Sequence, residues 1–231
     1  MGVQAEALRR FIGKPAKDIY GRYIGYVVGI TLNADGRLHS IGVDRGGGLF
    51  EEFLRSQIVV EGDSLLLIPS WKIRAENFRR EYSLTNSRFQ ALDELLKNKE
   101  IPEHVYEELY KEYKDSMVKL EETQKELAEK LTRKISEIDN HIKHLEKFLG
   151  HLKVQHKTGE INDETYKTAS DYLLSGIKKA LQEREDIKKS LEYVTMPEQQ
   201  FSSSTSTTAT TDLTSHEEIN RPIVVHLQDE D

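Results

Sequence analysis

The chain has 231 residues, of which 37% are hydrophobic and 32% charged, and its formal net charge is −7 at pH 7. This acidic balance argues against a dedicated nucleic-acid-binding protein, although a local basic patch is compatible with such binding. Because there is no cysteine, disulfides, thiolate zinc sites and a cysteine nucleophile are excluded. No stretch approaches the roughly 18 consecutive apolar residues that cross a bilayer, and the first residues lack a signal peptide's apolar run. We therefore expect a cytoplasmic protein.

Residues 1–75 are predicted to form a small β domain. The segment YIGYVVGITL is rich in strand-forming residues and is followed by NADG, where Gly36 suits a hairpin turn. LHSIGVD is the predicted return strand, and SQIVVEG and DSLLLIPSWKI add two more strands around a turn at Gly62. Four or five short strands with close turns indicate a small barrel that is closed or nearly closed. The glycine run RGGG at 45–48 lacks the Gly-Lys-Ser or Gly-Lys-Thr of a phosphate loop and is predicted to connect two strands.

The motif DIYGRYIGYVVGITLNADGRL, followed by LLLIPSWKI, resembles the PRC-barrel family. The family pattern is matched at Gly21, Ile24, Gly25, Val27 and the Ile68–Pro69 step. PRC barrels are mostly binding or docking modules, so the resemblance implies a docking role without a reaction.

Residues 76–196 are predicted to form a helical coiled-coil domain. From Tyr106 to Leu152, seam residues recur in steps of three and four, with one extra step of four between Leu131 and Ile135 that marks a stutter. The segment HKTGEIND ends this helix, and a second seam follows it. We expect two helices that fold back on each other as an antiparallel coiled coil, the longer about 75 Å in length. Such a rod serves as a spacer or a polymerisation surface, and a plain two-helix stalk is the alternative.

The two junctions that open the predicted helices are similar. KEIPEHVY and GEINDETY place Ile101 before Tyr106 and Ile161 before Tyr166 at the same spacing, 60 residues apart. The similarity is consistent with an internal duplication or with chance.

The most basic stretch follows the β domain and contains Arg74, Arg79, Arg80 and Arg88. Arginines with aromatic residues among them can contact an anionic membrane surface or nucleic acid. The same pattern suits a helix that packs against the β domain while its arginines shield apolar side chains, and we favour this structural interpretation.

No motif for catalysis is found: the sequence has no Gly-x-Ser-x-Gly elbow, Walker loop or His-Glu-x-x-His. His141 and His144 stand three apart near Glu137 and His151, a spacing that can hold a metal, but a second carboxylate–histidine cluster is missing. We interpret them as solvated neighbours of the seam. The sequence therefore predicts a non-enzymatic protein without metal or cofactor.

The last part of the chain divides into a linker and a peptide. Residues 197–216 are predicted to be a flexible Ser/Thr-rich linker, because the run SSSTSTTATT cannot bury enough apolar surface to order itself. Residues 217–231 are predicted to be a partner-binding peptide. The segment after Pro222 favours a strand, and a strand without a partner is suited to join the open edge of another protein's sheet. The alternative is that it completes the barrel of its own chain, which the length of the rod makes geometrically awkward.

The whole arrangement resembles the archaeal cell division protein CdvA family. The resemblance implies a scaffold that self-associates into dimers and filaments and recruits the ESCRT-III-like protein CdvB through the winged-helix domain of CdvB. It places the protein at mid-cell between the nucleoids, peripheral to the membrane, with membrane and DNA as further possible contacts. The matching peptide residues are Arg221, Pro222, Ile223, Val224, Val225, His226 and Leu227.

Two other functions fit parts of the sequence. A nucleic-acid-associated PRC-barrel protein would bind through the arginines near position 80, with affinity that falls steeply as salt rises. A plain structural dimer would have no partner for its last residues.

Overall fold

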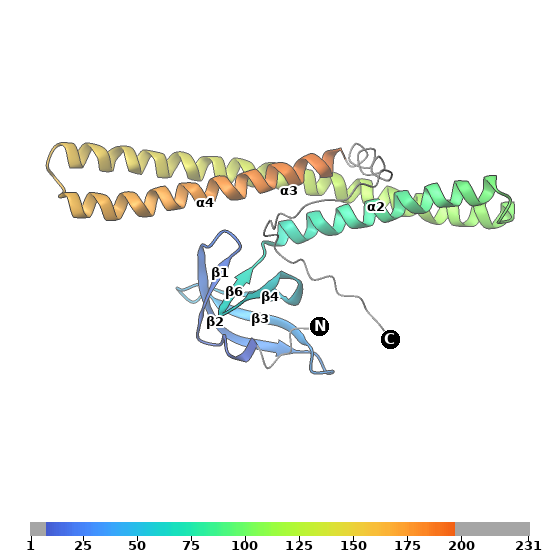
Figure 1. The fold of residues 1–231 in the computed structure, drawn as a ribbon, viewed down its shortest axis with the longest axis horizontal. Helices are drawn as coiled ribbons and strands as arrows, with labels where there is room; N and C mark the ends of the chain where they lie inside the picture. The colour runs from blue at the N-terminus through green and yellow to red at the C-terminus, as the bar shows by residue number, and fades with distance from the viewer. Residues whose placement is uncertain (1–7, 197–231) are drawn as a thin grey trace, which may run out of the picture.

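The computed structural model describes residues 8–196, which form a β-sheet domain and a helical rod above it (Figure 1). The sheet domain contains β1 (Pro15–Asp18), β2 (Tyr23–Leu32), β3 (Leu38–Asp44), β4 (Phe50–Leu54), the short 3-10 helix η1 (Arg55–Gln57), β5 (Ile58–Glu61) and β6 (Ser64–Leu67). The rod contains α2 (Ser70–Lys97), α3 (Glu103–Lys157) and α4 (Asp163–Thr195). The predicted α+β fold is confirmed.

The strands pair as one six-stranded sheet in the order β4-β3-β2-β1-β6-β5. All neighbours are antiparallel except β1 and β6, which are parallel. Within residues 8–196, β4 and β5 lie at the two edges and do not pair, so the described strand pairing does not close the predicted barrel. Sequence reasoning missed β1 and β4, because PAKD has no apolar alternation and FEEFL carries two glutamates.

Glycine fixes two features of the sheet domain. A Cβ on Gly25 would lie 2.1 Å from the backbone oxygen of Asp44, so only glycine lets β2 approach β3 this closely. Gly36 takes a φ of 78° in the predicted hairpin turn. The RGGG run connects β3 to β4, as predicted. The apolar core of this domain consists of Leu8, Phe11, Ala16, Val27, Leu38, Ile41, Val43, Phe53, Ile58, Leu65 and Leu67.

The rod is built around α3, which is about 80 Å long at 1.5 Å per residue. Figure 1 shows α2 running along the first half of α3 and α4 along the second half. The predicted antiparallel pairing of two helices is confirmed for α3 and α4, with seam residues such as Leu127, Ile142 and Ile187 buried between them. The predicted helical domain 76–196 includes most of α2, but the prediction paired only two helices and did not place α2 against α3.

The interpretation that α2 packs against the sheet domain is corrected: α2 touches η1 of that domain, but its apolar face packs in the rod. Ala75, Phe78 and Tyr82 lie on one face of α2 and are buried in the core of the rod, with α3 and α4. Farther along, the ring of Phe89 meets Tyr110 and Tyr113 edge to face, with ring centroids 5.5 and 5.9 Å apart. The part of α3 before Gln124 extends beyond the end of α4, and α2 covers its apolar seam.

The two helix junctions have the same geometry. At the end of α2, the amide of Glu100 donates to the carbonyl of Leu95, and at the end of α3 the amide of Glu160 donates to the carbonyl of Gln155, both at 2.9 Å. The residue before each of these glutamates is left-handed: Lys99 has a φ of 59° and Gly159 a φ of 74°. Both are Schellman-type helix ends, offset by 60 residues. The short sequence repeat therefore corresponds to a repeated structure.

The paired junctions predict opposite effects of exchanging their left-handed residues. Because a side chain is strained in this conformation, Lys99→Gly is expected to stabilise the protein by about 0.5–1 kcal/mol and Gly159→Lys to destabilise it by about 1 kcal/mol. Urea unfolding measures both. Gly150→Ala is the control: this glycine is inside α3 with open space around its Cβ position, so the change is expected to stabilise. A loss of stability in Lys99→Gly would contradict the assignment.

The rod folds back so that its last described residues lie near its first. The guanidinium of Arg79 lies 5.5 Å from the ring centroid of Tyr193, and the side-chain amide of Gln124 donates to the carbonyl of Val194 at 2.6 Å. The chain therefore leaves α4 beside α2, which begins two residues after Ile68. This corrects the expectation that the length of the rod separates the last part of the chain from the sheet domain.

Candidate functional site

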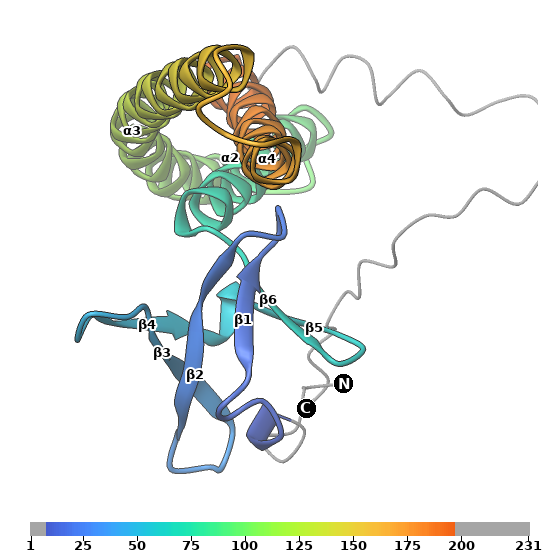
Figure 2. The same ribbon diagram turned by 90° about the vertical axis from the view of Figure 1, so that its left-hand side faces the viewer.

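The sheet domain meets the rod through the turn between β1 and β2, which faces α4 (Figure 2). The carboxylate of Asp18 shapes this turn: its Oδ1 accepts the backbone amides of Tyr20 at 2.9 Å and Arg22 at 2.8 Å. Gly21 has a φ of 75°, which completes the turn. These contacts explain physically why Asp18 and Gly21 stand in the motif DIYGR.

Arg22 joins the two domains. Its Nε donates to Oδ2 of Asp18 and its Nη1 to Oε2 of Glu183 on α4, both at 2.6 Å. Both carboxylates are buried, and the arginine side chain is 36% exposed. Burial alone would lower the pKa of Arg22, but the hydrogen bonds and charges of Glu183 and Asp18 outweigh it and raise the pKa. The guanidinium therefore stays charged between two carboxylates.

A second set of contacts lies one helical turn along α4. Asp186 accepts a hydrogen bond from the hydroxyl of Tyr20 at 3.2 Å. The same carboxylate oxygen forms an ion pair with the ammonium of Lys72 at 2.9 Å. The ammonium of Lys179 donates to the carbonyl of Gly21 at 3.0 Å. Burial first, and then the charge of Asp186, raises the pKa of the Tyr20 phenol above its ordinary value. The phenol is therefore kept neutral as a hydrogen-bond donor.

This polar junction fixes an orientation. The desolvation of buried ion pairs offsets much of their attraction, so such pairs add little net stability, but losing one partner leaves a buried charge without compensation. The sheet domain is thus held on α4 in a single register, set by Arg22 between its two carboxylates.

A cavity of about 380 Å³ lies between the sheet domain and the rod, next to the junction. Its wall includes charged residues of the turn, β4 residues and residues from all three helices: Asp18, Arg22, Glu51, Glu52, Trp71, Lys134 and Glu183. Trp71 is the single tryptophan of the chain, and its indole Nε1 is buried without a hydrogen-bond partner in residues 8–196. The cavity wall combines an aromatic side chain with charges of both signs.

The histidines considered from the sequence do not come together. His141, His144 and His151 are exposed on α3. Among residues 8–196, no group of three or more His, Asp or Glu side chains is arranged to hold a metal ion.

The comparisons with known proteins agree with the helical architecture. A family model, the CdvA-like coiled-coil domain, matches residues 70–218, which is more than half of the chain and begins at the first residue of α2. The chain belongs to the CdvA-like family. It is also similar to Cell division protein A of Sulfolobus acidocaldarius, with 28% identity over 192 residues that cover 83% of this chain and 80% of that protein. No solved structure matches the chain.

The resemblance to the CdvA family seen in the sequence is therefore confirmed, but its peptide is not described by the structure. Residues 221–227, the predicted binding peptide, lie outside the described residues, as does the predicted linker. No described helix is long and apolar enough to span a bilayer.

The four arginines of α2 are exposed but do not form one surface. At about 100° per residue, Arg74 and Arg88 lie about 40° apart, whereas Arg79 lies on the opposite border of the buried stripe. Arg79 and Arg88 extend over the rings of Tyr193 and Tyr113. Arg80 points away from the core.

Sequence reasoning missed the junction residues. The second helical seam passes through Arg184, a charged residue at a core position, next to Glu183. In the structure Arg184 pairs with Asp139 of α3 at 2.9 Å, and Glu183 turns to the sheet domain. The charged interruption of the seam therefore marked an ion pair within the rod, and no sequence pattern identified Glu183 as a domain contact.

We expect Glu183→Gln to loosen the junction in this CdvA-like protein. Removing the charge that faces Arg22 should weaken docking of the sheet domain by about 1–2 kcal/mol, allowing for the partial exposure of Arg22. Hydrogen exchange of the backbone amides of residues 18–22 should then accelerate about tenfold. Glu192→Gln, an exposed change on the same helix, is the control and should have no effect. Unchanged exchange in Glu183→Gln would mean that Arg22 does not hold the domains together.

Proposed function

We propose that this protein is a non-enzymatic scaffold of archaeal cell division that self-associates through its helical rod and recruits an ESCRT-III-like CdvB protein. The observation that carries the proposal is the family match, which covers the rod and part of the following chain, together with the relative named Cell division protein A. On this proposal the protein assembles into filaments at mid-cell between the nucleoids, peripheral to the membrane.

Recruitment would use residues 221–227 as an added β-strand on the winged-helix domain of CdvB. Alternate residues of a strand face the same side, so Ile223, Val225 and Leu227 would fill pockets on the partner. The acids 229–231 would meet a basic rim and steer the encounter. Copies displayed along a filament would capture a polymerising partner through many modest contacts.

The recruiting peptide can be tested alone. A synthetic peptide of residues 215–231 is expected to bind the purified winged-helix domain of CdvB in calorimetry. Val225→Asp with Leu227→Asp should abolish the heat, because both side chains would place a charge in an apolar pocket. A control peptide with Ser215→Asp and Asn220→Asp carries the same added charge outside the strand and should still bind. Binding by the first variant, or no binding by the native peptide, would refute this role.

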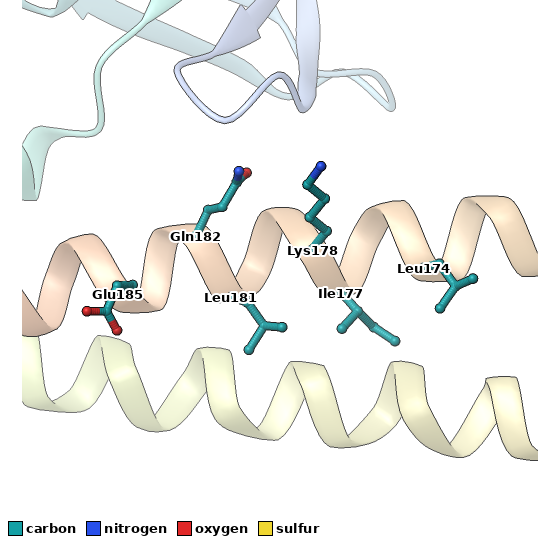
Figure 3. A pocket seen from close by; sticks show the side chains of 6 residues that line it. All are labelled: Leu174, Ile177, Lys178, Leu181, Gln182 and Glu185. Carbon is teal, nitrogen blue, oxygen red and sulfur yellow. The ribbon is translucent and has the colours of Figure 1, made fainter.

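Self-association would use a groove of about 410 Å³ on α4. Figure 3 shows Leu174, Ile177 and Leu181 extending toward α3, whereas Lys178 and Gln182, which line the same groove, extend away from α3. Leu174 and Leu181 remain 50% and 38% exposed, which favours a partner over the groove. Lys178 and Glu185 bound the groove with opposite charges. A second copy of α4 packed antiparallel would place each Lys178 opposite the Glu185 of the other copy.

A charge exchange tests this pairing. Lys178→Glu is expected to place two acids opposite each other and weaken self-association at least fivefold, as measured by analytical ultracentrifugation in low salt. Adding Glu185→Lys to the same chain restores opposite charges in the two-fold arrangement and should restore association. Failure of the double variant to recover, with the fold intact by circular dichroism, would exclude the antiparallel α4 pairing.

On this proposal, contact with the membrane or DNA would use the arginines of α2. Because Arg79 and Arg88 already extend over tyrosine rings of the rod, Arg74 and Arg80 are the better candidates for an anionic surface. The alternative function, a nucleic-acid-associated PRC-barrel protein, would rest on the same residues, and it leaves the family match over the rod without a role.

A further inference from the structure

β4 is an open edge of the sheet. In an antiparallel pair, residues alternate between those bonded to the neighbouring strand and those directed away from it. The amide of Arg45 donates to the carbonyl of Leu49, which places Glu51 and Phe53 in bonded pairs with β3. The amides of Phe50 and Glu52 therefore point outward, and within residues 8–196 neither amide has a partner on that side. The next outward amide, that of Leu54, donates to Oε1 of Gln57 instead.

Exposed apolar side chains accompany this edge. The register of the strands aligns Tyr26 with Asp44 and Asp44 with Phe50, so the two aromatic side chains lie on one face of the sheet. Phe50 is 69% exposed, Tyr26 52% and Leu54 47%. An edge strand with exposed apolar neighbours is a template for another strand, and natural proteins usually cover or blunt such edges.

The edge opens onto the cavity beside the domain junction. Glu51, Glu52 and Phe53 of β4 line this cavity together with Trp71 of α2. A strand added to β4 would therefore also contact the rod. Among the aromatic residues, Trp71 would report such an event, because it is the single tryptophan of the chain.

We infer that the outer edge of β4 is a strand-acceptor site, and that its occupant is the segment Ile223–Leu227 of the same chain. The segment has five strand-forming residues, and β4 has five. The inference uses the same residues as the proposed recruitment function and adds to it a second site, within this chain.

The geometry of the rod permits this contact. α4 passes the sheet domain at Asp186 and ends at Thr195, about 14 Å farther along at 1.5 Å per residue. The connecting residues 197–222 have a random-coil span of about 28 Å, which is enough to return to β4. A short tether holds the segment at an effective concentration of about 1 mM near β4. The acceptor site would therefore be occupied even if the segment binds it weakly.

Charge is compatible with docking in either direction. Arg45 precedes β4 and Arg55 follows it, so each end of β4 has an arginine that the acids 229–231 could meet, although at Arg45 they would share it with Glu51. Glu51 is paired with Arg45 at 2.8 Å, and Glu52 with Ser40, so the two glutamates of β4 are held by their own partners.

Docking on β4 would shelter the recruiting strand. A partner such as CdvB would then have to compete with the tethered site, and its apparent affinity for the full chain would be about tenfold lower than for the free peptide if docking is tenfold favourable. If β4 could no longer accept a strand, CdvB would bind the full chain and the free peptide with the same affinity.

Hydrogen exchange on the full chain tests the inference. The amides of Phe50 and Glu52 are expected to exchange at least tenfold more slowly in the full chain than in Val225→Pro, since proline breaks the added strand. Thr208→Pro in the linker is the matched control and should retain the protection. Neither change lies in residues 8–196, so neither disturbs the described fold. Trp71 emission should shift between the full chain and residues 1–216, and return when peptide 217–231 is added in excess.

The outcomes separate this inference from the proposed function. Equal, rapid exchange of Phe50 and Glu52 in the full chain and in Val225→Pro would overturn the docking site. Protection that grows with protein concentration would overturn the same-chain assignment and place the strand on a second copy. CdvB binding by the isolated peptide without protection of β4 leaves only recruitment standing, whereas protection without CdvB binding leaves only the docking site.

Discussion

The arrangement of this protein depends on one arginine held between two buried carboxylates. Arg22 belongs to the β1–β2 turn and connects Asp18 of the sheet domain to Glu183 of α4. A buried charge tolerates few alternative positions, because any displacement leaves it without its partner. The sheet domain is therefore fixed on the rod, and the cavity beside the junction has a defined wall.

The second constraint is that α3 is shared. Its first half packs against α2 and its second half against α4, and both turns at its ends have the same Schellman-type hydrogen bonds. One long helix thus belongs to two successive helical hairpins. Because the second hairpin returns toward the first, the end of α4 lies beside α2. A rod that extends far from the sheet domain still releases the following residues close to it.

Because the sheet domain is fixed on the rod and α4 ends beside α2, the proposed recruiting segment follows a point that is close to the open sheet edge. A scaffold that displays a strand-forming peptide must keep it from joining other sheets, and an edge strand must be kept from pairing with other chains. On the proposed docking, a single contact would address both problems. The same tether that permits recruitment would also supply the competing site, so assembly and release would be set by relative affinities and not by a change of fold.

The sequence by itself determined the elements that local patterning controls. Seam spacing identified α3, α4 and their antiparallel pairing, Gly36 and the RGGG run identified strand connections, and the combined motifs identified the family. Tertiary structure alone decided what depends on contacts between distant residues. The sequence pattern of the apolar face of α2 would be the same if this face covered a sheet or another helix. The structure shows that it covers the part of α3 that extends beyond α4. The roles of Arg22 and Glu183 arise from side chains 161 residues apart, whose pairing leaves no periodic signal in the sequence. The open edge of β4 likewise follows from strand order, which is a property of the assembled sheet.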